Sequence, residues 1–224
     1  METATGDRVN KRTRGQGHTP DFPRLLGGAL ALDFVNTVEA PISESPTEFL
    51  TSYVDVARWC HHSGALDEQQ VDGLVRAGAR KPNDADAVFE RVLELRAAAD
   101  AAFRRVAASK QPRRRDLLII EHEYLDALCN ARLVPARRGC HWRWDHRSSD
   151  LAIPLWRLVG GVVDLLLAGE LSRIKLCPGA GDCGWLFYDT SRHGRRRWCS
   201  MEGCGSRVKM RRHYARQKGR KPSL

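Results

Sequence analysis

The sequence of 224 residues predicts a mainly α fold, α+β overall: a helical N-terminal domain with a minor β-hairpin, followed by a small zinc-binding domain. Apolar residues recur at three- and four-residue steps between residues 47 and 171, which is the period of amphipathic helices. Four cysteines then form two close pairs near the C-terminus. Lysine and arginine are concentrated around these pairs, so the two parts of the chain differ in composition and in charge.

The chain is expected to divide into four parts. A hydrophobic content of 42% is enough for a real core. The expected parts are a flexible basic arm at 1–21, the helical domain at 22–171, the zinc finger at 172–218 and a tail at 219–224.

Five helices are expected in the helical domain, of which the second is short. They are 47–62 with a Thr47 cap, 67–79, 84–108, 114–130 and 153–171. Residues 132–136 and 140–145, joined through Arg138-Gly139, predict a hairpin. Strand-like residues 173–176 and 185–188 flank the first cysteine pair.

An apolar run at 25–38 carries three polar residues, Asp33, Asn36 and Thr37. A buried polar group needs a hydrogen-bond partner. These side chains are therefore expected either to cap a turn or to point into a pocket for a small-molecule effector.

The cysteine pairs, Cys177 with Cys183 and Cys199 with Cys204, predict one structural Zn²⁺. Zinc takes four thiolates tetrahedrally, and short spacings let each half of the site form on a tight turn. A glycine follows the second cysteine of each pair, where such turns need unusual backbone conformations: Gly184 and Gly205. His193 or His213 could replace one ligand, although the pairing favours four cysteines. The other cysteines have apolar sequence neighbours and are expected to be ordinary buried thiols: Cys60, Cys129 and Cys140.

The net charge of +10 is carried by the C-terminal segment. Residues 170–224 hold fourteen Lys and Arg against four Asp and Glu, whereas residues 1–169 hold twenty-three of each sign. On a helix starting near Ser206 the cations would surround the axis and repel one another unless a polyanion neutralised them, while Met210 and Tyr214 could anchor the helix on the zinc site. Nucleic acid is the expected partner. The expected contacts are Arg195, Arg196, Arg197, Arg207, Lys209, Arg211, Arg212 and Arg216.

Catalytic signatures are missing from the sequence, so no enzyme is expected. Residues 179–184 spell GxGxxG, but a dinucleotide site needs a helix at the last glycine, and Trp185-Leu-Phe-Tyr188 is strand-like. The longest apolar stretch, 151–168, is broken by Pro154, Arg157 and Asp164, which argues against a membrane span. A polar start and seven cysteines favour a cytoplasmic, nucleoid-associated protein with reduced thiols.

Four stretches carry a family resemblance: Leu32-Asp-Phe-Val-Asn-Thr37, Cys183-Gly-Trp-Leu-Phe-Tyr-Asp-Thr-Ser191, Arg196-Arg-Trp-Cys-Ser-Met201 and Cys204-Gly-Ser-Arg207. With these motifs the chain resembles the bacterial CGNR zinc-finger proteins with an N-terminal ABATE domain, a family regarded as stress-induced transcription regulators. The resemblance implies a treble-clef or ribbon-like finger that ends in a basic helix, with zinc held by the four paired cysteines. The chain departs from the family pattern in having Ser206 for Asn and one extra residue in the first cysteine pair. Serine can also cap a helix, so the same fold is expected.

These observations favour a zinc-binding, DNA-binding transcription regulator whose helical domain senses a signal or mediates dimerisation. The expected partners are double-stranded DNA, a small-molecule effector and a second copy of the chain, and no membrane. Two alternatives stay open: an RNA- or ribosome-associated zinc protein, and a zinc module for protein contacts. Stacking aromatic residues would favour RNA, but Trp185, Phe187 and Trp198 could all be used in a small core.

Overall fold

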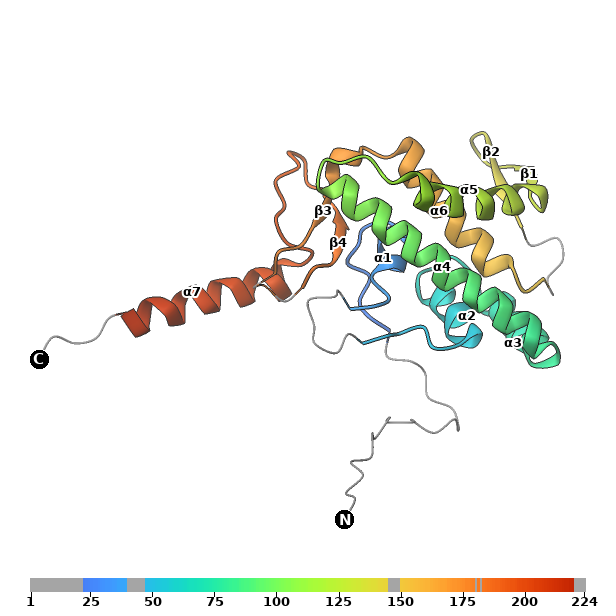
Figure 1. The fold of residues 1–224 in the computed structure, drawn as a ribbon, viewed down its shortest axis with the longest axis horizontal. Helices are drawn as coiled ribbons and strands as arrows, with labels where there is room; N and C mark the ends of the chain where they lie inside the picture. The colour runs from blue at the N-terminus through green and yellow to red at the C-terminus, as the bar shows by residue number, and fades with distance from the viewer. Residues whose placement is uncertain (1–21, 40–46, 145–149, 180, 182, 220–224) are drawn as a thin grey trace, which may run out of the picture.

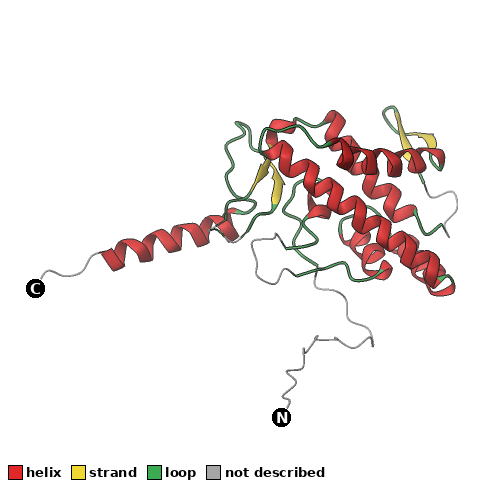
Figure 2. Ribbon diagram, in the orientation of Figure 1, coloured by secondary structure: helices red, strands yellow, loops and turns green. Residues whose placement is uncertain are grey.

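The protein is a helical body from which one helix projects, as seen in a computed structural model (Figure 1). The structure describes residues 22–39, 47–144, 150–179, 181 and 183–219. The predicted arm lies outside these residues, as does the tail beyond residue 219. Within the described ranges, no helix combines the length and the apolar character needed to cross a membrane. The mainly helical fold with small antiparallel hairpins is confirmed (Figure 2).

The helices of the body follow the predicted order. They are α1 Leu30–Val35, α2 Tyr53–His62, α3 Glu68–Arg80, α4 Pro82–Ala107, α5 Arg114–Cys129 and α6 Ile153–Ala168. Local sequence sets several of the starts, because Ser52 caps α2 and Asp67 forms a capping box with Gln70 at α3. Proline stands in the first turn of α4 and of α6, where its missing N–H leaves no bond unmade.

Helix α4 is the centre of the body. It packs against α1, α2, α3, α5 and α6, so its predicted apolar face is covered along its length. The buried residues of this face keep the three- and four-residue spacing: Ala85, Val88, Val92, Leu95, Ala99 and Ala102. Close packing also joins α6 to α1, where a Cβ added to Gly161 would lie 3.1 Å from Leu30.

The first predicted helix begins at Tyr53 rather than at Thr47. The preceding residues pair with a distant segment instead of starting a helix. The Glu39 N–H donates to the Thr47 carbonyl at 2.9 Å, and the Phe49 N–H donates to the Thr37 carbonyl at 3.1 Å. The local Thr47 cap is therefore outcompeted by tertiary hydrogen bonds.

Arg96 of α4 holds this pairing from inside the body. Its guanidinium donates to Thr37 Oγ1 at 2.9 Å and makes a two-pronged ion pair with Glu48. Thr37 in turn donates from its hydroxyl to the Phe34 carbonyl at 2.7 Å. A charge buried to this extent is tolerated because its hydrogen-bonding groups are matched by a carboxylate and a hydroxyl.

Both predicted hairpins are present. Their strands are β1 Arg132–Pro135, β2 Cys140–Arg143, β3 Ile174–Leu176 and β4 Leu186–Tyr188. β1 pairs antiparallel with β2, and β3 pairs antiparallel with β4. A short 3₁₀ turn, η1 Leu171–Arg173, leads from the end of α6 into β3.

The β3–β4 hairpin belongs to the core of the body, although it lies in the predicted zinc finger. Ile174 and Leu186 are buried in the same apolar cluster as the helices. The Asn36 side chain, at the end of α1, donates to the Leu186 carbonyl at 2.8 Å and accepts from its N–H at 3.0 Å. On the same strand, the Tyr188 N–H donates to the Gly27 carbonyl at 2.7 Å. The hairpin is thereby joined to the start of the helical body.

We expect Asn36→Ala to lower the free energy of unfolding by about 3 kcal/mol, because it leaves the buried N–H and carbonyl of Leu186 without partners. Urea denaturation followed by circular dichroism measures this. Asn83→Ala is the matched control, since Asn83 is exposed in the first turn of α4. Equal stability of the two variants would show that the Asn36 bonds do not support the fold.

Candidate metal centre and basic helix

The turn between β3 and β4 presents the first cysteine pair. The Cys177 N–H donates to the Trp185 carbonyl at 2.8 Å, and the Gly184 N–H donates to the Cys177 carbonyl at 3.1 Å. Gly184 has a φ of 66°, the left-handed conformation predicted for it. This tight return brings the Cys183 thiol back toward Cys177.

The second cysteine pair leads into the basic helix. A π-helical turn, η2 Met201–Gly205, carries Cys204 and continues directly into α7, Ser206–Gly219. The Ser200 hydroxyl caps the turn by accepting from the Gly203 N–H at 3.1 Å. Two details differ from the prediction. Gly205 lies in the helical turn and has no left-handed backbone, and Ser206 does not cap α7, because its hydroxyl donates to the Met201 carbonyl inside a continuous helix.

The four predicted ligands converge on one point. Their sulfur atoms all lie within 4.8 Å of one another, and no histidine of the described chain belongs to the group. The Cys199 sulfur is 3.7 Å from the sulfurs of Cys183 and Cys204. Zinc bonded to four thiolates at about 2.3 Å would set neighbouring sulfurs about 3.8 Å apart. The donor set and its spacing therefore fit one structural zinc, closed on all four sides.

The pKa values of the thiols reflect the repulsion between neighbouring thiolates, which a metal ion would relieve. Hydrogen bonds from Cys183 and Cys199 hold the pKa of Cys177 well below its usual value. The same bonds raise the pKa of Cys183 and Cys199, because a second thiolate would lie beside the first. A bound dication offsets this repulsion and deprotonates its ligands. Arg207 adds positive charge at the rim, donating to the Cys204 sulfur at 3.2 Å.

Little apolar surface supports the metal centre. Among the described residues, its cluster contains the cysteines and the buried Phe187, with Leu26 and Trp198 packed partly against them. So small a core does not offset the conformational entropy of ordering the loops around it. Metal binding is therefore expected to supply much of the stability of this part.

Asp189, directly after β4, organises the loop between the two cysteine pairs. Its fully buried carboxylate accepts from the Lys175 ammonium at 2.7 Å, from the Ser191 hydroxyl at 2.6 Å and from the Arg196 N–H at 2.8 Å. Burial alone would raise the pKa of Asp189, but these hydrogen bonds outweigh it and keep the pKa below its usual value. Asp189 was not predicted from the sequence, because the sequence does not show whether an acidic residue in a basic segment is buried and hydrogen-bonded or exposed to solvent.

Arg196 points inward and is used by the metal centre. Its guanidinium donates to the carbonyls of Trp198 and Cys199 and lies 4.8 Å from the ring centre of Phe187. Its side chain thus fixes the loop that carries Cys199. This placement differs from the expected contact with nucleic acid.

The other predicted basic residues lie at the surface. Arg195 and Arg197 are exposed on the loop before the second cysteine pair, and Arg197 stacks over Trp198 at 5.4 Å. The exposed basic side chains of α7 are Arg207, Lys209, Arg211 and Arg212, and Arg216 lies further along the same helix. Met210 and Tyr214 are each 55% exposed, so the prediction that they anchor α7 on the metal centre is wrong.

The three residues considered for a ligand pocket lie at the junction of the two parts. Asn36 and Thr37 are buried and hydrogen-bonded to Leu186 and Arg96, as described above. Asp33 accepts from the Gly27 N–H at 2.6 Å, and burial raises its pKa. Asn36 and Thr37 thus bond to distant elements of the fold, and Asp33 bonds to the backbone of the segment before α1.

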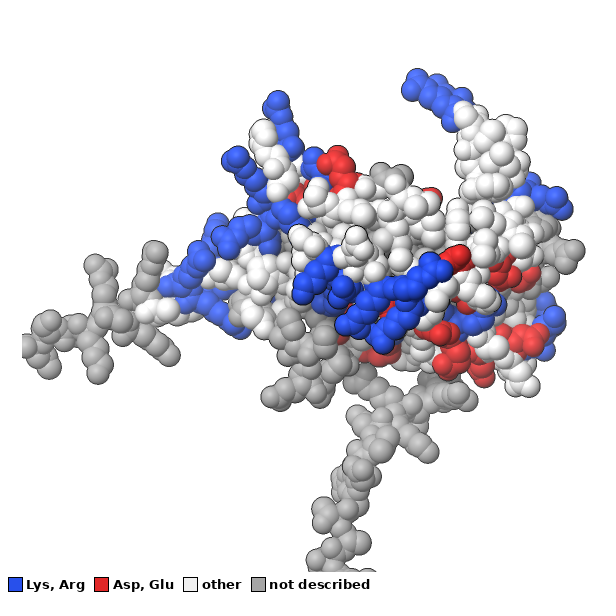
Figure 3. All heavy atoms as spheres, turned by 45° about the horizontal axis from the view of Figure 1, so that its top comes forward, with Lys and Arg blue, Asp and Glu red and all other residues white. Residues whose placement is uncertain are grey.

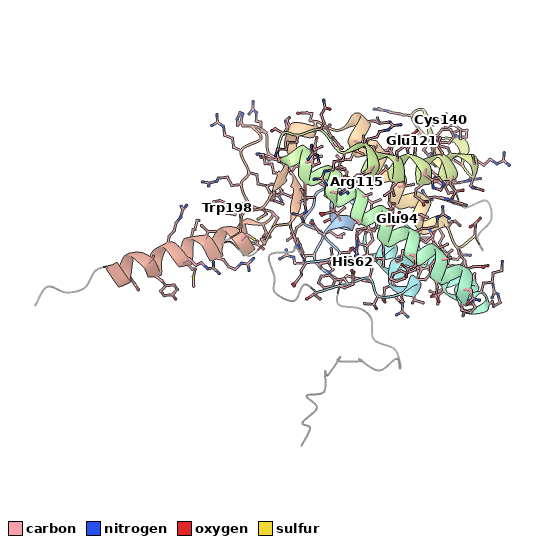
Figure 4. The ribbon with its side chains drawn as sticks, viewed as in Figure 1. His62, Glu94, Arg115, Glu121, Cys140 and Trp198 are labelled. Carbon is pink, nitrogen blue, oxygen red and sulfur yellow. The ribbon has the colours of Figure 1, made fainter. Side chains whose placement is uncertain are left out.

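The remaining cysteines divide into two kinds. Cys60 is buried, and this burial raises the pKa of its thiol to about 12, which leaves it unreactive. Cys129 and Cys140 are exposed, so the prediction that they are buried thiols is wrong. Cys140 lies on the β1–β2 hairpin, at the end of the body away from Trp198 (Figure 4). Apolar neighbours in sequence did not reveal which side of these short elements faces solvent.

We expect the purified protein to hold one zinc per chain and Cys183→Ser to lose nearly all of it, because three thiolates no longer close the tetrahedron. Inductively coupled plasma mass spectrometry measures the metal content. Cys140→Ser is the control, since Cys140 is outside the cluster. Full zinc occupancy in Cys183→Ser would contradict the four-cysteine assignment.

Asp189→Asn should destabilise the zinc-binding part by about 3 kcal/mol, because it leaves a partly buried lysine without its charge partner. Release of zinc during urea denaturation, followed with a chromogenic chelator, reports on this region. Asp164→Asn, at an exposed position of α6, controls for the loss of one carboxylate. An unchanged zinc-release transition in Asp189→Asn would mean that the loop is organised by other contacts.

Comparisons with known proteins agree with this geometry. Residues 28–169 match the ABATE family, described as "Putative stress-induced transcription regulator", and residues 173–217 match the family described as "CGNR zinc finger". A comparison with curated proteins found no match. Since the ABATE match spans more than half of the sequence, the chain belongs to the ABATE family and carries a CGNR zinc finger in its C-terminal part.

Proposed function

We propose that this protein binds double-stranded DNA with its zinc finger, uses α7 as the recognition helix, and regulates transcription. The main support for this proposal is the position of α7, which projects away from the helical body (Figure 1). A helix that is polar on all sides and lacks a packed face is not stabilised by the fold. A polyanion that neutralises its cations would stabilise it.

The dimensions of α7 suit duplex DNA. The major groove is about 12 Å wide and admits one α-helix. Lys209, Arg211 and Arg212 are exposed on different sides of α7, so that some can meet phosphates while others approach base edges. Arg195 and Arg197, on the loop beside the start of the helix, would contact the flanking backbone.

Two aromatic rings at the metal centre favour duplex DNA over single-stranded RNA. Phe187 is buried in the metal centre, and Arg197 covers the ring of Trp198. Recognition of unstacked bases needs open aromatic faces. These rings are already used within the protein, which supports the duplex as partner.

For the helical part we propose the reception of a signal or the pairing of two copies, with limits near 22–171 for this part and 172–218 for the finger. Support comes from the junction, where the Asn36 amide bonds α1 directly to β4 of the finger. A change in α1 would shift the strand that positions Cys183 and, through the metal, α7. Such a connection is what a regulator needs between its sensing part and its DNA-binding part.

We expect Lys209→Gln/Arg211→Gln/Arg212→Gln to abolish binding to duplex DNA at physiological salt and to reduce the salt dependence of the affinity by up to about three units of slope. Fluorescence anisotropy over a salt series measures both quantities. Arg58→Gln/Arg76→Gln/Arg80→Gln removes equal charge from exposed positions on α2 and α3 and is the control. Arg196 is left in place because its guanidinium holds the metal centre.

Competition between a duplex and a single-stranded RNA of equal length separates the proposal from its rival. Preference for the RNA, or duplex affinity unchanged by the three substitutions on α7, would overturn the proposal.

A further inference from the structure

A second basic surface lies on the helical body, where α4 ends and α5 begins. Residues 104–115 contain six Lys and Arg and no Asp or Glu. The segment from 108 to 113, which joins the two helices, is exposed except for the partly covered Pro112, and the first two residues of α5 are exposed as well. The net charge of residues 1–169 does not reveal this cluster of cations, because acidic residues elsewhere in the body balance it.

The connection from α4 to α5 lies beside the zinc finger. At the end of α4, the Arg104 guanidinium donates to the Gly184 carbonyl in the cysteine turn at 3.1 Å. α4 also contacts β3 and η1. Arg115, in the first turn of α5, lies on the part of the body nearer to Trp198 than Cys140 does (Figure 4). The basic residues of this connection and those of the finger therefore belong to neighbouring surfaces.

The cations of this connection are available for an external partner. The side chains of Lys110, Arg113 and Arg114 make no hydrogen bond or ion pair with any residue that the structure describes. Arg115 pairs with Asp116 at 3.1 Å, but its side chain is 71% exposed and such a pair is weak. Arg105 differs, because its guanidinium holds the connection by donating to the Gln111 carbonyl at 2.6 Å.

The cations at the start of α5 are only partly balanced, by Asp116 in its first turn. Arg113 is the N-cap of α5, provides no side-chain cap, and is followed by two more arginines. Positive charge at a helix N-terminus opposes the helix dipole. Ser109 has a φ of 57°, a left-handed conformation that costs a serine more than a glycine. The turn, closed by the Lys110 N–H donating to the Arg105 carbonyl at 2.8 Å, leaves Lys110 and Arg113 at the surface.

We propose that residues Lys110, Arg113, Arg114 and Arg115 form a second contact with the sugar–phosphate backbone of the same duplex that the zinc finger binds. Space-filling atoms show Lys and Arg gathered from the zinc-finger end onto the neighbouring part of the body, while Asp and Glu concentrate toward the end away from α7 (Figure 3). Exposed cations that do not enter a groove recognise phosphates rather than sequence. This inference rests on the proposed DNA binding and adds to it that the helical body takes part directly.

The test compares Lys110→Gln/Arg113→Gln/Arg114→Gln with Arg58→Gln/Arg76→Gln/Arg80→Gln, which removes the same charge from α2 and α3. Anisotropy with a duplex long enough to extend past the finger is expected to show about tenfold weaker binding for the first variant. Its salt slope should fall by two to three units, roughly one for each lost phosphate contact. The loss should be equal for different sequences, whereas substitutions on α7 should also change the preference among sequences.

Acetylation provides a second measurement on the unaltered protein. Lys110 should be protected from an amine-reactive acetylating reagent when the duplex is bound, whereas Lys81, on the connection between α3 and α4, should react equally with and without it. Peptide mass spectrometry reads both sites.

The outcomes separate this inference from the proposed function. If the wild-type protein does not bind duplex DNA, the proposed function fails. If it binds and the α7 variant does not, yet the loop variant matches its control and Lys110 stays reactive, the second contact is overturned. A loop variant with unchanged duplex affinity that no longer binds phosphatidylserine vesicles would also overturn it and assign the surface to a membrane.

Discussion

The coordination of one metal ion by four cysteines is the interaction on which the C-terminal part depends. The cysteines come from two separate turns, and the cluster around them contains a single fully buried aromatic ring, that of Phe187. Without a metal, four thiols within 4.8 Å of one another cannot all ionise, and the loop from β4 to η2 has little apolar surface to hold it. Asp189 and Arg196 hold the loop around the site. Asp189 accepts hydrogen bonds from N–H, hydroxyl and ammonium groups, and Arg196 donates to backbone carbonyls. The zinc thus has a structural task, and α7 begins where its last ligand ends.

The finger and the helical body form one continuous structure. The β3–β4 hairpin places Ile174 and Leu186 in the core of the body, and Asn36 bonds to the backbone of Leu186 in the way that a neighbouring strand would. Arg104 adds a bond from α4 to the cysteine turn. A consequence is that the hairpin carrying the first cysteine pair is held to the body by short, directional contacts rather than by a linker. Such a connection would allow the body and the finger to meet a single extended partner together.

The charge distribution explains why nucleic acid is the partner proposed for both surfaces. α7 carries its cations on several sides and exposes Met210 and Tyr214, so no packed face supports it. The connection between α4 and α5 carries cations at a helix N-terminus, where they are electrostatically unfavourable. Each arrangement would be stabilised by a polyanion. The excess of positive charge in residues 170–224 revealed the surface on α7. The surface at the α4–α5 connection was not revealed, because acidic residues elsewhere in the body bring the net charge of residues 1–169 to zero.

Features that depend on neighbours along the chain could be predicted from the amino-acid sequence. The stripe of α4, the caps of α3, both hairpins and the four ligand cysteines follow from local spacing, because period, turn chemistry and ligand pairing act over a few residues. Tertiary structure decided the rest. Thr47 does not start a helix, because its backbone finds partners near Thr37, and Asn36 is a bridge between the two parts, because β4 arrives beside it. Likewise, Arg196 turns inward while Arg195 and Arg197 stay outside, although the three are adjacent in sequence. Spacing cannot distinguish such residues, since their roles depend on which distant groups the fold brings within hydrogen-bond range.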